Sequence, residues 1–210
     1  MATRSIYLVL GSILLYCSCA KSSNSVPYIT CPSFDDPLFI EWFPYTTDQK
    51  MIFKNSAGLA DTISIASVNL SGQTTIIKLN FTADSCIAVA TIVSNEKVDS
   101  GGILKLFLYD YRTASGLDTV TFYMYGFTFK ALAVTDTGLN IAYLSPGIYS
   151  ASYTNYNFQG RIYNKVQVIN STDTIVKLTN IPWIYKVFIA QNTGIIGYET
   201  FPQKEIWALQ

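Results

Sequence analysis

The chain has 210 residues, with 14 basic against 14 acidic residues and no histidine. We therefore expect no nucleic-acid partner, because neutralising phosphates needs a basic surface and the sequence shows none. The lack of histidine removes the Ser-His and Cys-His nucleophile systems and the commonest metal ligand, so we predict neither a metal nor another cofactor.

The first residues have the form of an export signal. Arg4 precedes an apolar run from 6 to 16, and Ser18 and Cys19 follow it. As a helix this run would cover roughly 18 Å, which is too short for the ~30 Å hydrocarbon core of a membrane. The boundary Tyr16-Cys17-Ser18-Cys19 resembles the bacterial lipobox, in which a small residue precedes the lipidated cysteine. The resemblance implies cleavage after residue 18 and a lipid on Cys19; the alternative is an ordinary secretory signal.

These features divide the chain into a signal peptide at 1–18, a lipidated cysteine with a flexible tether at 19–27, and a domain at 28–210. The stretch 21–25 is polar, rich in serine and without an acidic run, as expected of a tether. By resemblance to other lipoproteins, Ala20 and Lys21 after the cysteine imply the outer membrane, facing the periplasm. The remaining length suits a single domain with a sizeable core.

Cys31 and Cys86 are the cysteines beyond the signal. An even pair in an oxidising compartment predicts a disulfide. The alternative is two buried thiols, because Cys86 begins an apolar strand.

From Leu38 onward the chain reads as strands without a helical period. Apolar residues alternate with polar ones over runs of five to eight residues, as at 75–81 and 120–125, and glycine-containing turn signals separate the runs. In the run that starts at 183, Trp183, Tyr185, Val187 and Ile189 are expected on one face. The pattern predicts an antiparallel all-β domain, either a β-sandwich or a curved half-barrel sheet.

Aromatic residues are in excess, with 15 Tyr, 12 Phe and 3 Trp. Phe107 and Tyr109 lie opposite Leu106 and Leu108, so this strand is apolar on both faces. Such a sheet is sandwiched, curled around an apolar cavity or covered by a partner. Phe107 and Tyr109 are therefore candidate binding residues.

The stretch 138–160 is rich in Tyr, Ser and Asn and is interpreted as a long loop or a domain seam. Within it, Tyr149, Tyr153 and Tyr156 have the composition of a recognition loop, because tyrosine gives amphipathic contact at low entropy cost. The alternative is a plain polar loop.

The C-terminal segments 163–168, 187–199 and 205–209 resemble the ending of a broad group of uncharacterised bacterial envelope lipoproteins. In that group a strand precedes a glycine-containing hairpin and a closing apolar strand, and the chains are similar to the curved half-barrel sheets of lipoprotein carriers. The resemblance implies a curved sheet and brings no catalytic residues.

Acidic residues are the remaining candidates for catalysis, because a glycosidase needs two carboxylates about 5 to 10 Å apart. The candidates are Asp35, Asp36, Glu41, Asp110, Glu199 and Glu205. We interpret them as solvated turn and strand-edge charges, and so predict that the protein is not an enzyme.

The sequence thus predicts a lipid-anchored envelope protein that binds an apolar ligand, a glycan or a partner envelope protein. A structural subunit of an envelope assembly is the alternative, and a carboxylate-dependent glycan hydrolase is the least favoured.

Overall fold

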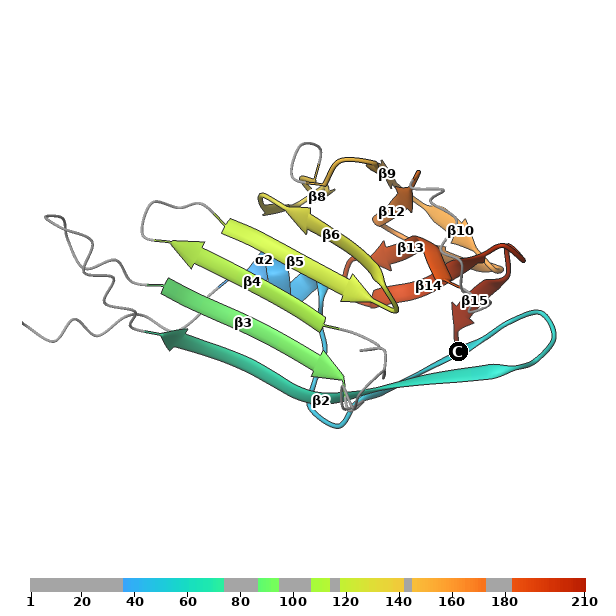
Figure 1. Cartoon of the computed structure of the whole chain (residues 1–210), viewed down its shortest axis with the longest axis horizontal. Coiled ribbons are helices and arrows are strands. Elements are labelled where there is room, and N and C mark those ends of the chain that lie inside the picture. The colour runs from blue at the N-terminus through green and yellow to red at the C-terminus, as the bar shows by residue number, and fades with distance from the viewer. Residues whose placement is uncertain (1–35, 74–86, 95–106, 114–117, 142–144, 173–182) are drawn as a thin grey trace, which may run out of the picture.

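The computed structural model describes residues 36–73, 87–94, 107–113, 118–141, 145–172 and 183–210. Within these ranges nearly all regular structure is antiparallel β-strand (Figure 1), which confirms the predicted all-β class. Cys19, Cys31 and Cys86 lie outside the described residues, as does Asp35.

Sixteen elements follow one another within the described ranges. They are α2 (Pro37–Trp42), β1 (Lys50–Lys54), β2 (Ala60–Gln73), β3 (Ile87–Ser94), β4 (Phe107–Thr113), β5 (Asp118–Met124), β6 (Phe127–Ala131), β7 (Val134–Thr135), β8 (Gly138–Leu139), β9 (Ile148–Tyr153), β10 (Tyr156–Phe158), β11 (Arg161–Tyr163), β12 (Val166–Ser171), β13 (Trp183–Ala190), β14 (Gly194–Phe201) and β15 (Ile206–Leu209).

Eleven strands form one sheet in the order β6-β5-β4-β3-β2-β1-β15-β14-β13-β12-β9. The long strand β2 joins its two halves. Residues 60–64 pair with β1, and residues 65–73 pair with β3 after a register shift between Ile65 and Ser67. Such an irregularity bends a strand and increases its twist, so the sheet curls at β2.

The main core lies between the two halves of the curled sheet. Met51, Phe53 and Ile63 meet Phe122 and residues of β13 and β14 there, and all are buried. β6 contacts β13 across this core. The C-terminal strands β13 to β15 are therefore interior strands of the sheet, with β15 seated between β14 and β1.

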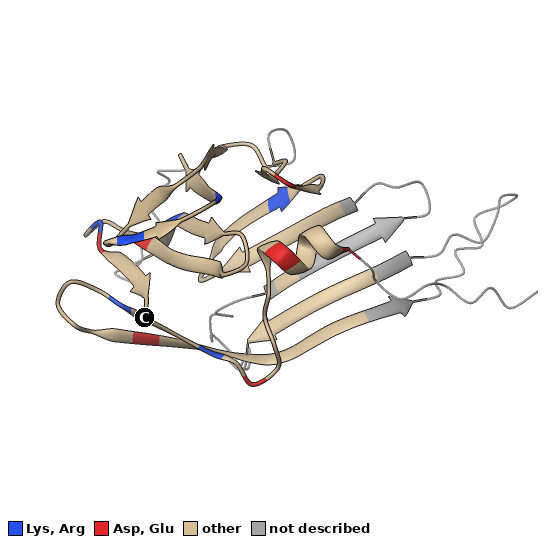
Figure 2. Ribbon diagram, turned by 180° about the vertical axis from the view of Figure 1, so that it is seen from behind, with Lys and Arg blue, Asp and Glu red and all other residues tan. Residues whose placement is uncertain are grey.

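The short helix α2 packs into this core and departs from the expectation of strands from Leu38 onward. Figure 2 shows it lying against the strands. Asp36 caps it, with Oδ1 accepting from the backbone N–H of Leu38 at 3.0 Å and Phe39 at 3.1 Å, and Pro37 fits the first turn because its missing N–H needs no partner there. Trp42 is fully buried and donates from Nε1 to the Thr135 carbonyl at 3.0 Å.

Two further expectations were wrong. The stretch 138–160, interpreted as a loop or seam, contains β9 and β10, because Tyr and Ser alternate there in strand period. In β13 a bulge at Tyr185 shifts the alternation. Ile184, Val187 and Ile189 face the main core, whereas Trp183 and Tyr185 do not join it.

Candidate ligand-binding groove

The outer face of the C-terminal strands carries side chains in cross-strand rows, because directly opposed residues of antiparallel strands point to the same face. The strand registers define a polar row across β9, β12, β13, β14 and β15. Its members are Tyr149, Asn170, Lys186, Glu199 and Ile206. Two residues along each strand lies a less polar row, namely Ala151, Val168, Phe188, Gly197 and Ala208.

The β10–β11 hairpin covers this second row. The Phe158 ring lies 4.5 Å from the Phe188 ring, centroid to centroid, and both side chains are buried in a second hydrophobic cluster with Val166 and Val168. Gly197 makes the approach possible, because a Cβ atom there would lie 2.5 Å from Phe158 Cζ. The sheet is thus apolar on both faces in this region, and the hairpin supplies the cover that such a sheet needs.

The polar row stays open beside the hairpin, and four of its members form the floor of a pocket of about 420 Å³, namely Asn170, Lys186, Glu199 and Ile206. Lys186 and Glu199 stand on this floor with 2.7 Å between Nζ and Oε2, and Asn170 adjoins them in the row. The Glu199 side chain is 11% exposed and the Lys186 side chain 27% exposed, so the ion pair is largely shielded from water.

A third side chain, Tyr185, joins the ion pair. The strand register shifts at the bulge between Ile184 and Lys186, and the Tyr185 hydroxyl hydrogen-bonds to the Glu199 carboxylate. Burial raises the pKa of Tyr185 above its ordinary value, and the hydrogen bond to the Glu199 carboxylate and its charge raise it further. Lys186 Nζ lies 5.4 Å from the Tyr185 ring centre and 5.9 Å from that of Phe188, so both rings are within the range of a cation–π contact with the ammonium.

Aromatic rings line one wall of the pocket. Tyr156 lies 5.1 Å from Tyr153 and 6.2 Å from Phe188, centroid to centroid, and its ring is nearly parallel to that of Phe188. Tyr153 is 45% exposed and Tyr156 is half-buried. The wall therefore offers apolar ring faces directly beside the charged floor.

The structure brings together two of the five predicted binding residues, Tyr153 and Tyr156. Tyr149 shares the outer face but is 61% exposed and does not line the pocket. Phe107 and Tyr109 lie in β4, in the other half of the sheet, and their side chains lie outside the described part of the structure.

The acidic candidates prove to have separate local roles. Besides Asp36, which caps α2, Glu41 accepts a hydrogen bond from Gln191 Nε2 at 2.7 Å. Asp36 and Glu199 are both buried, and Glu199 is paired with Lys186, which corrects the interpretation of these two residues as solvated charges. Glu205 lines an adjacent pocket, and the side chain of Asp110 is not among those described.

Sequence reasoning missed Lys186, Glu199 and Asn170 as a group. Lys186 and Glu199 are single charges inside otherwise mostly apolar strands, and this pattern is the sequence feature that could have marked them as site residues. Their meeting depends on the β13–β14 register, which two irregularities shift. Alternation alone does not reveal such shifts.

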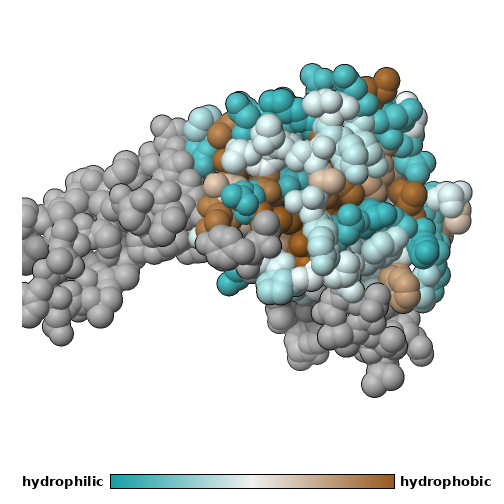
Figure 3. All heavy atoms as spheres, turned by 90° about the horizontal axis from the view of Figure 1, so that it is seen from above, coloured by the Kyte–Doolittle hydropathy of each residue, from teal (hydrophilic) through white to brown (hydrophobic). Residues whose placement is uncertain are grey.

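The surface seen from above β8 and β9 mixes hydrophilic and hydrophobic residues (Figure 3), so on this side of the described structure no single apolar face dominates. Within the described ranges, no helix is both long and apolar enough to cross a membrane. The same residues contain no cluster of three or more His, Cys, Asp or Glu side chains suited to a metal ion.

Fold and groove together describe an all-β protein with a curled sheet and an aromatic-walled polar pocket on its outer face. Comparison with protein-family models, curated proteins and solved structures finds no match to this chain.

Proposed function

We propose that the protein is a non-catalytic, lipid-anchored envelope protein that binds a glycan in the outer-face groove. The observation that carries the proposal is the wall of Tyr153 and Tyr156 beside the Lys186–Glu199 pair in one pocket. A sugar ring has a C–H face that packs on aromatic rings and a rim of hydroxyls that needs donors and acceptors. The groove offers both surfaces side by side.

The polar floor favours a glycan over a wholly apolar ligand. An apolar ligand would cover Asn170 and the ion pair without replacing their bonds to water, which is costly for buried polar groups. Hydroxyl groups can bond to both the amide and the charges. The volume of about 420 Å³ falls within the ~300 to 1,000 Å³ typical of small-ligand sites.

The arrangement of carboxylates supports binding over hydrolysis. Both mechanisms of glycoside hydrolysis use two carboxyl groups about 5 to 10 Å apart. Among the described residues that line the pocket, Glu199 is the one carboxylate, and it is bound to Lys186 and Tyr185. A carboxylate held in this way is a fixed hydrogen-bond acceptor for a ligand.

The envelope location rests on the sequence. Arg4, the apolar run and Ser18 before Cys19 support a lipid anchor, and the residues after Cys19 support the periplasmic side of the outer membrane. A glycan-binding domain on such an anchor would hold a periplasmic or membrane-attached polysaccharide near the membrane.

The test is binding of the full-length protein in detergent micelles to an array of neutral and acidic oligosaccharides. Tyr156→Ala removes the central ring of the wall, and we expect at least a tenfold loss of affinity for the glycans that the parent binds. Tyr149→Ala is the matched control, because Tyr149 is on the same face outside the pocket. Equal effects of the two changes, or no glycan bound by the parent, would contradict the proposal.

A further inference from the structure

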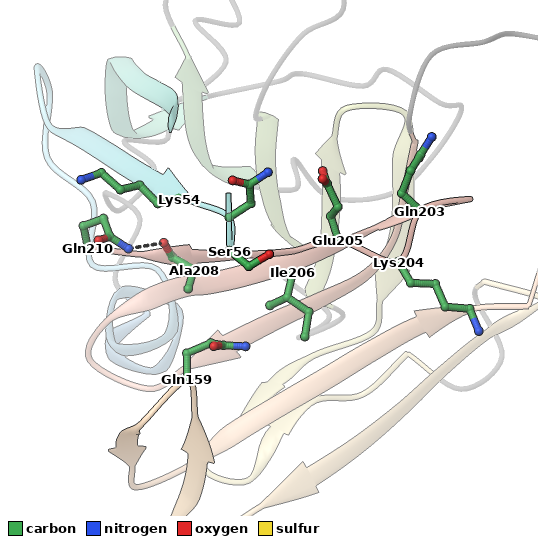
Figure 4. Close-up of a pocket in the computed structure, with 10 residues that line it drawn as sticks. Lys54, Ser56, Gln159, Gln203, Lys204, Glu205, Ile206, Ala208 and Gln210 are labelled. Atoms are coloured by element: carbon green, nitrogen blue, oxygen red, sulfur yellow. Dashed lines mark hydrogen bonds between the residues drawn. The ribbon is translucent and has the colours of Figure 1, made fainter. Parts of the chain in front are cut away.

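A second pocket adjoins the groove. It has a volume of about 510 Å³ and lies among the end of β1, the β10–β11 turn and the β14–β15 turn (Figure 4). Gln159 and Ile206 line both pockets, so the two pockets adjoin at these side chains. A ligand seated on the aromatic wall can therefore extend across Ile206 into the second pocket.

Two residues of the second pocket have unfavourable backbone conformations. Gln159 and Lys204 have φ values of 50° and 56°, in the left-handed region that favours Gly, Asn and Asp. Gln159 and Gly160 form the two-residue turn of the β10–β11 hairpin with positive φ at both positions, where Asn-Gly is the preferred pair. The stability of the two turns therefore does not explain why Gln and Lys occupy positions 159 and 204. Strain of this kind gathers at functional sites.

The charges of the second pocket favour an anion. Lys54 and Lys204 stand on opposite sides of Ile206 in Figure 4, and Glu205 is the single acidic residue of the lining. Within the described part of the chain these three residues form no ion pair, unlike Lys186 in the first pocket. Gln159 and Gln203 add side-chain amides, which both donate and accept hydrogen bonds.

We infer that the second pocket binds further units of the same ligand, and that this ligand is a linear oligosaccharide bearing carboxylates, of the uronate class. The inference rests on the proposed glycan-binding function. The aromatic wall holds one part of the chain, the Gln159 amide contacts it at the junction, and the two lysines attract its carboxylates.

The experiment is calorimetric titration of the full-length protein in micelles with dimers and hexamers of galacturonate and of mannuronate. Carboxyl-reduced hexamers serve as neutral counterparts. For at least one uronate we expect the hexamer to bind at least tenfold more tightly than both its dimer and its reduced counterpart. Equal affinities for dimer and hexamer, or for hexamer and reduced hexamer, would overturn the inference.

The diagnostic variant is Gln159→Gly, which relieves the backbone strain. We expect its melting temperature to match or exceed that of the parent while hexamer affinity falls about five- to tenfold, the effect of losing one ligand hydrogen bond. Unchanged hexamer affinity in a folded Gln159→Gly protein would overturn the inference.

Failure of the inference and failure of the proposed function give different results. If the array shows glycan binding that depends on Tyr156 but no uronate binds, the second pocket is wrongly assigned and the function stands. If no glycan binds at all, both are wrong.

Discussion

Asp61 links the two halves of the sheet through two hydrogen bonds, one to each half. Its Oδ2 accepts from the hydroxyl of Tyr125, at the β5–β6 turn, and from that of Tyr198, in β14, each at 2.7 Å. Tyr198 also stacks on Trp207 of β15, with ring centres 5.9 Å apart. One carboxylate on β2 thus fixes strands that come from both sides of the core.

We predict that Tyr198→Phe lowers the free energy of unfolding by about 1.5 to 3 kcal/mol, the usual range for a hydrogen bond to a charged group. Urea unfolding followed by circular dichroism measures the change. Tyr123→Phe is the control, because the Tyr123 hydroxyl makes no hydrogen bond to another residue of the described ranges. If both variants unfold at the same urea concentration as the parent, the Asp61 link does not contribute to stability.

At the N-terminus we predict that Cys19→Ser abolishes metabolic labelling with a fatty-acid probe, because Ser18 supplies the small residue required before the lipidated cysteine. Cys17→Ser is the matched control and should leave labelling intact. Labelling that survives in Cys19→Ser but is lost in Cys17→Ser would move the anchor to Cys17, and a parent protein that takes up no label would leave a plain secretory signal.

Among the elements, the β10–β11 hairpin is the one that shapes the groove. It rests on β14 at Gly197, where an added Cβ would approach both the Phe158 ring and the Trp207 carbonyl oxygen to 2.5 Å. The hairpin can therefore cover the apolar row only while position 197 lacks a side chain.

We predict that Gly197→Ala destabilises the protein by about 1 to 3 kcal/mol, the range for overpacking a tight contact. It should also weaken glycan binding, because the displaced hairpin carries Tyr156. Combining the change with Phe158→Ala removes one of the two clashes, so the double variant should lose less stability than the sum of the single changes. Strict additivity would show that the Phe158 ring does not rest on Gly197.

The sequence predicted a strand at 120–125, where polar and apolar residues alternate, and β5 lies there; the other alternating run, 75–81, lies outside the described residues. It missed α2, although Asp36-Pro37 before an apolar turn is a helix-start signal, because six residues are too few to show a helical period. It placed Tyr153 and Tyr156 in the site but not Lys186 and Glu199. An aromatic cluster can be recognised from the local composition of the sequence. The pairing of Lys186 with Glu199 depends on the register of β13 against β14, which the composition does not reveal.

For the molecule as a whole, buried tyrosines set the response to alkaline pH. Tyr45 is fully buried, and its hydroxyl oxygen accepts from the backbone N–H of Ile195 at 2.8 Å. Burial raises the pKa of Tyr45 above its ordinary value of 10.0, and the bond from Ile195 lowers it only in part. Burial, followed by the hydrogen bond to Asp61, raises the pKa of Tyr198.

The sign of the resulting pH dependence follows from these directions. Above about pH 10 the unfolded chain loses tyrosine protons that the folded protein keeps, so the free energy of unfolding falls as pH rises. We predict a melting temperature that drops steeply above about pH 10, and a shallower drop in Tyr198→Phe. Thermal melts across this range measure it; a midpoint that stays level to about pH 11 would contradict the burial of these hydroxyls.

The central claim is that a glycan lies against Tyr153 and Tyr156 over the Lys186–Glu199 pair. Nuclear magnetic resonance of the protein with ¹³C-labelled Tyr and Phe rings, titrated with a glycan that the array identifies, tests it most directly. We predict that the ring signals of Tyr153 and Tyr156 shift in proportion to occupancy, while those of Phe122 and Phe129, stacked 4.7 Å apart in the main core, stay in place. Binding that shifts other ring signals and leaves Tyr153 and Tyr156 unmoved would contradict the claim.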